Sequence, residues 1–323
     1  MTTWQLQWRH GQAELRALGG LLGPVTFNLA DGRTLQPMYI APWADEPGTD
    51  DLPPLLRELR GELPCVPFGR TDFPEGLKDW SPRDPGDAWE HGYSANQPWS
   101  LISSDAQHLR IGIDYPVDSD IRRLERQISA DPDHPALDIS LTIWVRRDVT
   151  LPVALHPTFR VSPQGVTVNP GRFKSAIAYP IPAEPGISHL QPNGSSADLA
   201  AMPAISGTID LTHLPIPPKT EELLQLIDCT PPFSLYYDSE GVEMSLWWDP
   251  SQLPDVMLWV SNGGRAAFPW NGRNYALGVE PVNGVFDLGR VAAPPADHPL
   301  AARRGLALKK DQPTRLDYRM AAR

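Results

Sequence analysis

Proline is the residue that most constrains what this chain can fold into. The sequence has 37 prolines in 323 residues, spread along its whole length. A proline inside a helix removes a backbone hydrogen bond and clashes with the preceding turn, so few long helices can form. A chain of this length can still bury a large core. We therefore expect that core to be built from strands and ordered loops.

Alternation of apolar and polar residues predicts strands in both halves of the chain. Near the N-terminus, Trp4, Leu6 and Trp8 alternate with polar residues, and Asp31-Gly32 is a hairpin signal. Further strands are predicted at residues 25–29, 99–103, 109–115, 121–129, 137–146, 151–161, 233–237, 242–248, 256–260, 266–270, 275–280 and 316–320. This spacing is typical of an antiparallel sandwich or barrel. We predict one all-β domain over residues 1–323, with a short helix within residues 52–63.

Residues 42–99 differ from the rest of the chain. They are rich in proline and glycine and contain Trp43, Trp80, Trp89 and Trp99. Loops of this length in a compact domain tend to be functional. The tryptophans either belong to the core, which is the more common outcome, or line a ligand cleft.

Charge and composition exclude several classes of partner. Lys and Arg number 28 against 39 Asp and Glu, which gives a net charge of −11. An acidic surface disfavours nucleic-acid binding. No apolar run approaches the roughly 18 residues of a membrane span, and the first residues lack a signal-peptide pattern. We predict a cytoplasmic protein, monomeric or homodimeric, without a nucleic-acid or membrane partner; Cys65 and Cys229 are expected to be buried free thiols.

Common catalytic motifs are absent from the sequence. There is no phosphate-binding loop, no Gly-x-Gly-x-x-Gly after a strand and no Gly-x-Ser-x-Gly. The histidines never occur as His-x-His or His-Glu-x-x-His, so their spacing does not indicate a metal site. We therefore expect no metal and no cofactor.

Two titratable residues, His156 and Glu280, stand in apolar runs that end at Pro157 and Pro281. Proline cannot donate a ladder hydrogen bond and so marks a strand end, where side chains often face a cleft. Histidine and carboxylate are well suited to moving protons near neutral pH. The alternatives are a structural histidine and a glutamate buried in a salt bridge, since an unpaired carboxylate is costly to bury.

Four segments, in their order along the chain, resemble the aldose 1-epimerase (galactose mutarotase-like) family. They are residues 63–70 (LPCVPFGR), 91–99 (HGYSANQPW), 155–159 (LHPTF) and 278–283 (GVEPVN). The resemblance covers nearly the whole chain. It implies a single large antiparallel β-supersandwich with an open cleft on one concave sheet. It also implies an isomerase of carbohydrate metabolism that interconverts the α and β anomers of an aldose or aldose phosphate without a cofactor.

The resemblance assigns roles to individual residues. Glu280 matches the general base and His156 the general acid, while His91 matches a second histidine that contacts substrate. Arg70 matches a ligand of a sugar hydroxyl. Asp228 is the nearest candidate for an acidic residue that the family places on a late strand, although the residues around it match poorly.

Several features leave the substrate open. The third segment lacks the family's usual asparagine, the second lacks its following glycines, and residues 71–90 look like an insertion. An aromatic ring is expected to pack against the apolar face of a pyranose, and Trp99 is one candidate. Arg70, Arg83 and Arg265 would either hold a phosphate or pair with acids.

The chemistry implied by the resemblance needs one acid and one base. The base removes the proton of the anomeric hydroxyl while the acid protonates the ring oxygen, and the roles reverse on closure. We expect His156 and Glu280 to face one pyranose from opposite sides. The alternatives are a non-catalytic carbohydrate-binding protein of the same fold, and a lyase or hydrolase on a related sandwich.

Overall fold

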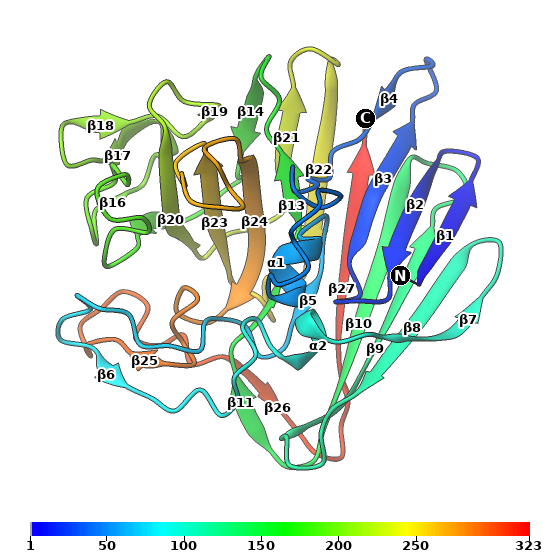
Figure 1. Ribbon diagram of the computed structural model, residues 1–323, viewed down its shortest axis with the longest axis horizontal. Coiled ribbons are helices and arrows are strands. Elements are labelled where there is room, and N and C mark those ends of the chain that lie inside the picture. Colours follow the sequence, from blue (N-terminus) through cyan, green and yellow to red (C-terminus); the bar gives the residue numbers. More distant parts are fainter. Residues whose placement is uncertain (1) are drawn as a thin grey trace.

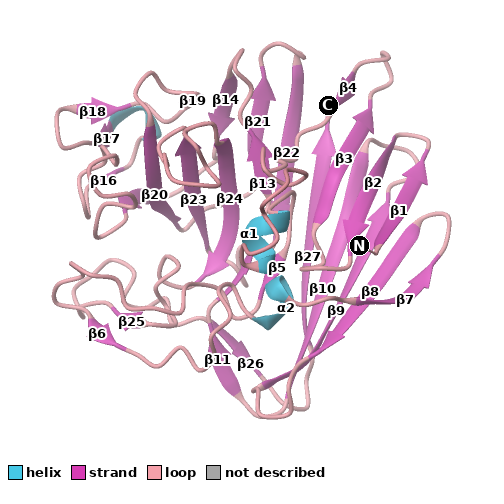
Figure 2. Cartoon of the chain, viewed as in Figure 1, coloured by secondary structure: helices cyan, strands magenta, loops and turns pink. Residues whose placement is uncertain are grey.

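Almost all of the regular secondary structure in the computed structural model, which describes residues 2–323, is antiparallel strand (Figures 1 and 2). A four-stranded sheet at the N-terminus packs beside a nine-stranded sheet, and an eight-stranded sheet completes the molecule. The N-terminal sheet contains β1 (Thr3–Trp8), β2 (Gly11–Arg16), β3 (Leu22–Asn28) and β4 (Thr34–Leu35). The predicted all-β class is confirmed.

The nine-stranded sheet holds the longest strands. In spatial order it contains β19 (His213–Leu214), β14 (Val166–Asn169), β21 (Phe233–Tyr237), β22 (Val242–Trp248), β27 (Thr314–Ala322), β10 (Ala136–Val145), β9 (Ile121–Ala130), β8 (His108–Asp114) and β7 (Ser100–Ser104). Along β9 and β10, buried and partly exposed residues largely alternate, as expected for a sheet with one face on the core.

The eight-stranded sheet is covered on both faces. In spatial order it contains β16 (Ser195–Ser196), β15 (Ser175–Ala178), β20 (Thr220–Ile227), β23 (Asp255–Asn262), β24 (Tyr275–Asn283), β12 (Val153–Leu155) and β5 (Pro64–Cys65), and β13 (Thr158–Arg160) also pairs with β24. Every residue of β23 is buried. Strands buried on both faces lose the polar alternation of a half-exposed sheet.

One face of this sheet joins the main apolar core. Leu258 of β23 and Leu277 and Val279 of β24 pack there with residues of the N-terminal and nine-stranded sheets. The intervening residues, such as Met257 and Trp259, point the other way into separate apolar clusters. Because side chains alternate along a strand, β24 presents Gly278 and Glu280 to this second face.

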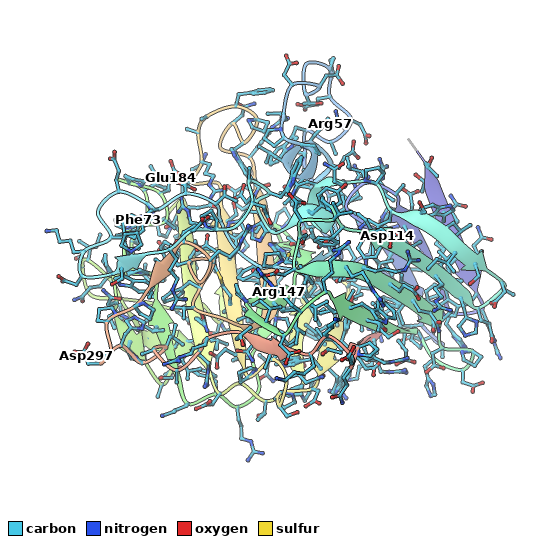
Figure 3. The ribbon with its side chains drawn as sticks, turned by 90° about the horizontal axis from the view of Figure 1, so that it is seen from below. Arg57, Phe73, Asp114, Arg147, Glu184 and Asp297 are labelled. Carbon is cyan, nitrogen blue, oxygen red and sulfur yellow. The ribbon has the colours of Figure 1, made fainter. Side chains whose placement is uncertain are left out.

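Loops and short helices cover the second face. In Figure 1 the helix α1 (Pro54–Glu58) lies near the centre of the molecule, to the right of β24, and α2 (Tyr93–Asn96) lies below α1. Viewed from below, the segment that carries Arg57 projects from one side of the molecule (Figure 3). The remaining elements are the pairs β11 (Val149–Leu151) with β26 (Leu306–Leu308), β17 (Met202–Pro203) with β18 (Thr208–Ile209) and β25 (Ala292–Ala293) with β6 (Ser81–Pro82), and a 3₁₀ turn at Leu199–Ala201.

Some local predictions differ from the structure. The helix expected within residues 52–63 is confirmed but spans only Pro54–Glu58. The strand expected at residues 266–270 is wrong, because this segment is a loop and turn between β23 and β24. Sequence patterns also missed β20, where two consecutive glutamates, Glu221 and Glu222, are both buried. None of the helices in residues 2–323 has the length and apolar character needed to cross a membrane.

A buried ion pair joins the N-terminal loops to the nine-stranded sheet. Arg126 of β9 and Glu62 are both fully buried and in contact, and Tyr318 donates to Glu62 at 2.8 Å. Glu62 precedes Leu63, whose carbonyl accepts a hydrogen bond from the His156 backbone at 2.9 Å. The pair therefore holds a segment that positions His156.

Removing one member of this pair is expected to destabilise the protein strongly. The variant Arg126→Met leaves the Glu62 carboxylate buried without a cation, which typically costs about 3–5 kcal/mol. Urea denaturation measures the loss. The double variant Arg126→Met/Glu62→Leu is expected to recover much of it, and a loss below about 1 kcal/mol in the single variant would contradict the assigned role.

Candidate active site

Strand register brings His156 and Glu280 together. Ala154 pairs with Val282, and Thr158 pairs with Gly278 on the other side of the break at Pro157. His156 lies midway between these positions and therefore sits across from Glu280. The distance from His156 Nε2 to Glu280 Oε1 is 3.4 Å. Two residues far apart in sequence thus form a direct cross-strand pair.

Neighbouring groups fix the orientation of the imidazole. The His156 backbone N–H donates to the Leu63 carbonyl, and the Pro157 carbonyl accepts from Val279 at 2.9 Å. The Thr158 hydroxyl lies 3.2 Å from His156 Nδ1. With Nδ1 donating to the Thr158 hydroxyl, the neutral imidazole presents an unprotonated Nε2 to Glu280, and this nitrogen can take a proton from the carboxyl group.

His91 completes a cluster of three ionisable groups. Its backbone is left-handed, with φ of 57°, and its N–H donates to the Gly69 carbonyl at 2.9 Å. The ring lies between Phe68 and His156, with centroid distances of 5.1 and 5.3 Å. His91 Nδ1 is buried without a hydrogen-bond partner. A ligand hydroxyl would satisfy that nitrogen.

These three residues line one cavity of about 560 Å³. This volume lies within the usual range of small-molecule sites. Its apolar lining includes residues of α1 and β23. Polar side chains, among them His91, His156 and Glu280, also line it. The cavity is lined by Pro53, Pro54, Leu55, Leu56, Leu59, Leu63, Thr71, Ala88, Trp89, Glu90, His91, Asn96, His156, Leu223, Met257, Trp259, Arg265, Trp270, Glu280 and Asp287.

Burial determines the protonation of the cluster. It raises the pKa of Glu280 well above its ordinary value, and the nearby charge of Asp287 adds to this rise. Burial and the neighbouring His91 lower the pKa of His156 to about 3. Burial likewise lowers the pKa of His91 to about 4. Burial therefore favours the neutral form of all three groups, and a proton shared by the pair rests on Glu280 rather than on His156.

Asp287 is a site residue that sequence reasoning missed. It is positioned by its carbonyl, which accepts from the Arg70 backbone at 2.9 Å, and by its Oδ1, which accepts from Tyr179 at 2.7 Å. Gly69 allows this approach, since a Cβ there would lie 2.2 Å from the Asp287 carbonyl. Asp287 lies beyond the predicted strand. The only sequence feature that could have indicated it is its position shortly after the GVEPVN segment.

Arg70 is not among the residues that line the cavity. Its guanidinium makes two hydrogen bonds to Asp72, at 3.2 and 2.8 Å. The structure therefore brings together His91, His156 and Glu280. Arg70 is linked to this group only by its backbone hydrogen bond to Asp287, which lines the cavity.

The other two predicted site residues lie elsewhere. Asp228 is half exposed and pairs with Arg303, outside the residues that line the cavity. Trp99 is buried in the main core, where its Nε1 donates to the Ser94 carbonyl at 2.9 Å. The aromatic rings that do line the cavity are Trp89, Trp259 and Trp270.

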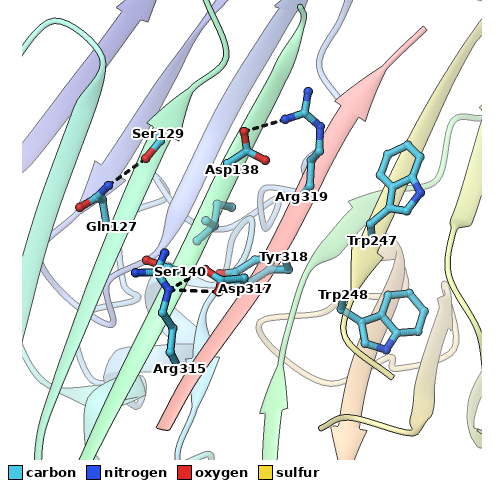
Figure 4. Close-up of a pocket in the computed structure, with 11 residues that line it drawn as sticks. Gln127, Ser129, Asp138, Ser140, Trp247, Trp248, Arg315, Asp317, Tyr318 and Arg319 are labelled. Atoms are coloured by element: carbon cyan, nitrogen blue, oxygen red, sulfur yellow. Dashed lines mark hydrogen bonds and ion pairs between the residues drawn. The ribbon is translucent and has the colours of Figure 1, made fainter. Parts of the chain in front are cut away.

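A second hollow of about 310 Å³ lies on the outer face of the nine-stranded sheet (Figure 4). Its charged residues are paired, with Arg319 on Asp138 and Arg315 on Asp317. No histidine lines it, and both of its aspartates are paired with these arginines. Within residues 2–323 no cluster of three or more His, Cys, Asp or Glu side chains is arranged to hold a metal ion.

Several solved structures that superpose on this chain are named as aldose epimerases or galactose mutarotase relatives. A protein of Escherichia coli K12, provisionally assigned as an aldose 1-epimerase, superposes with a TM-score of 0.65 at 15% identity, covering 100% of this chain and 99% of its own. An aldose epimerase homologue from C. elegans gives 0.61 at 11% identity, covering 100% and 98%. A galactose mutarotase related enzyme from Lactobacillus acidophilus gives 0.59 at 13%, covering 100% and 97%.

Sequence comparison alone finds no relative. No protein-family model matches the chain, and no curated protein matches it significantly. The structural matches establish that the chain has the galactose mutarotase-like fold, which confirms the resemblance suggested by the four segments.

Gly278 is expected to control the position of the Glu280 carboxylate. A Cβ at Gly278 would lie 2.6 Å from Glu280 Oε1 and 3.1 Å from Trp259 Cβ. Gly278→Ala should therefore displace the carboxylate and lower any activity that depends on it by about 10²-fold. Thermal denaturation serves as the control for folding. Full activity in a folded Gly278→Ala variant would contradict this prediction.

Proposed function

We propose that the protein interconverts the α and β anomers of an aldose, which is the reaction of an aldose 1-epimerase. The observation that carries the proposal is the contact between His156 and Glu280 inside a cavity large enough for a monosaccharide. The names of the structural matches agree with this activity. A binding protein would need polar and aromatic contacts but no buried acid–base pair.

The reaction opens and closes the sugar ring. Glu280, as a carboxylate, removes the proton of the anomeric hydroxyl, and an O–H bond forms on Glu280 as the C1 carbonyl develops. His156, protonated, gives its proton to the ring oxygen as the C1–O5 bond breaks. Rotation about C1–C2 exposes the other face of the carbonyl, and closure returns both protons.

Contact between the two residues suits this chemistry. The anomeric hydroxyl and the ring oxygen are attached to the same carbon, so the acid and the base must also be neighbours. Because His156 and Glu280 lie 3.4 Å apart, we propose that they meet the sugar on one side, in place of the opposite sides expected from the sequence. A sugar bound over the pair would place its two acetal oxygens against these two side chains.

The shifted pKa values set the energy of the starting state. Burial raises the pKa of Glu280 and lowers that of His156, so the proton rests on Glu280 in the empty site. Moving it to His156 creates the carboxylate and imidazolium that attack the cyclic sugar. Since the pair holds one proton in total, each turnover has one donor and one acceptor, and their roles exchange between opening and closing.

Other cavity residues would bind the sugar ring. The unpartnered Nδ1 of His91 would accept from a sugar hydroxyl. Trp259 and Trp270, with ring centroids 6.0 Å apart, would pack against the apolar C–H face in the role first considered for Trp99. The polar side chains of the lining are available to the sugar hydroxyl groups.

Replacing either member of the pair is expected to remove most of the activity. Glu280→Gln and His156→Gln should each slow anomer exchange by about 10²–10⁴-fold, since each loses a positioned proton donor or acceptor. NMR exchange spectroscopy on aldose anomers measures the rate. Asp228→Asn, outside the cavity, is the control and should keep the wild-type rate. Wild-type exchange in folded Glu280→Gln would favour the binding-only alternative.

The pH dependence should reflect the shifted pKa values. Between the His91 pKa of about 4 and the raised pKa of Glu280, the rate of exchange should stay level because the pair keeps one proton. Below this range His156, with a pKa of about 3, gains a second proton and the rate falls. At high pH the rate falls when Glu280 loses its proton. An acid limb at the ordinary histidine pKa of 6.5 would show that His156 is not desolvated.

A further inference from the structure

We propose that Arg265 is the arginine that binds the sugar in this cavity, and that it binds the hydroxyl groups at C3 and C4, across the ring from the acetal. This inference rests on the proposed function and adds a specificity-determining residue to the same site. It gives Arg265 the role that the family resemblance assigned to Arg70. It follows from the place of Arg265 in the lining, from its unused hydrogen-bond donors and from its position along the sheet relative to Glu280.

Arg265 supplies the guanidinium of the cavity. Among the residues of 2–323 that line the cavity, it is the only lysine or arginine. It lies in the loop between β23 and β24, and 27% of its side chain is exposed. Arg70 and Arg83 do not line the cavity, and Arg70 donates two hydrogen bonds to Asp72. Arg265 is therefore the guanidinium that a ligand in the cavity can reach.

The side chain of Arg265 keeps donors that the protein does not use. Its Nε lies 3.4 Å from Glu221 Oε1 and 3.5 Å from Glu184 Oε2. These are ion-pair contacts, and within residues 2–323 the side chain makes no hydrogen bond. Both terminal nitrogens of a guanidinium carry N–H donors in a fixed fork. Hydroxyl oxygens on adjacent sugar carbons can accept from this fork.

Aromatic rings and a buried carboxyl group restrain the guanidinium. Its Cζ lies 4.7 Å from the centroid of the Trp270 ring and 6.0 Å from that of Trp259. Glu221 is fully buried, and it accepts from Trp259 Nε1 at 2.5 Å and from Ser261 Oγ at 2.9 Å. Glu221 thus holds the Trp259 ring and faces Arg265 at the same time. A restrained donor loses less conformational freedom when it binds a ligand.

Strand register separates Arg265 from the acid–base pair. Met257 of β23 pairs with Glu280. Further along the same strand, Ser261 pairs with Glu221, which contacts Arg265. The four-residue step from Met257 to Ser261 spans about 13 Å of strand. A pyranose with its C1 and ring oxygen at the pair can therefore extend toward Arg265, and C4 and C3 are the ring carbons opposite C1 and the ring oxygen.

The test pairs the arginine with the hydroxyl groups that it is proposed to bind. Calorimetric binding and NMR anomer exchange are measured for glucose and galactose and for their 2-deoxy, 3-deoxy and 4-deoxy derivatives. In the wild type, loss of the 3- or 4-hydroxyl should weaken binding about 10-fold or more, because that hydroxyl bonds to a charged group. Arg265→Gln should bind the parent sugars about 10- to 100-fold more weakly, with little further loss for the 3-deoxy and 4-deoxy sugars.

Further readouts distinguish sugar binding from a structural effect. In Arg265→Gln, KM should rise while kcat stays near the wild-type value, because the lost contact is made equally before and during the reaction. The 2-deoxy sugars should lose the same affinity in both proteins. Arg265→Lys keeps the charge without the planar fork and should restore only part of the affinity. Arg323→Gln, which removes an arginine paired with Glu243 outside the cavity, is the matched control.

The outcomes separate this inference from the proposed function. If Arg265→Gln binds the parent sugars as tightly as the wild type, or still discriminates against the 3-deoxy and 4-deoxy sugars, the inference is overturned and anomer exchange remains. A larger loss of affinity in Arg70→Gln than in Arg265→Gln would also overturn it. The predicted binding pattern without exchange in the wild type would support the inference and contradict the catalytic function. Neither binding nor exchange of any of these sugars would contradict both.

Discussion

The site depends on the register between β24 and the broken strand formed by β12 and β13. This pairing sets His156 directly across from Glu280 and holds them through backbone hydrogen bonds on either side of Pro157. A one-residue slip would turn Glu280 into the main core and Val279 toward the cavity. The acid–base pair is therefore a consequence of sheet pairing, and it needs no flexible loop to assemble it.

The surrounding loops supply the burial that gives this pair its chemistry. All four segments of the family resemblance meet around the pair. The Leu63 carbonyl accepts a hydrogen bond from the His156 backbone, and the Gly69 carbonyl accepts one from the His91 backbone. Covering the second face of the sheet desolvates Glu280 and His156 and shifts their pKa values in opposite directions. We infer one domain over residues 1–323, because a single apolar core includes both Leu6 and Ala322.

The sequence allowed the all-β class, most long strands and the pairing of His156 with Glu280 to be predicted. Strand alternation and proline breaks are local signals, and they carried the first two predictions. The pairing of His156 with Glu280 also needed the resemblance of the four segments, because local signals do not bring distant residues together. The sequence could not place Asp228 or Trp99, because tertiary packing determines their surroundings. Asp228 pairs with Arg303, and Trp99 is buried in the main core. Asp287 and the buried glutamates of β20 were missed for a related reason, as an acidic residue normally indicates a surface.

A crystal structure of the protein with a bound aldose tests the central claim most directly. The account predicts a pyranose in the cavity with its anomeric and ring oxygens within hydrogen-bond distance of Glu280 and His156, one oxygen on each. A sugar seated in the hollow of the nine-stranded sheet, or one that turns its anomeric carbon away from this pair, would contradict it.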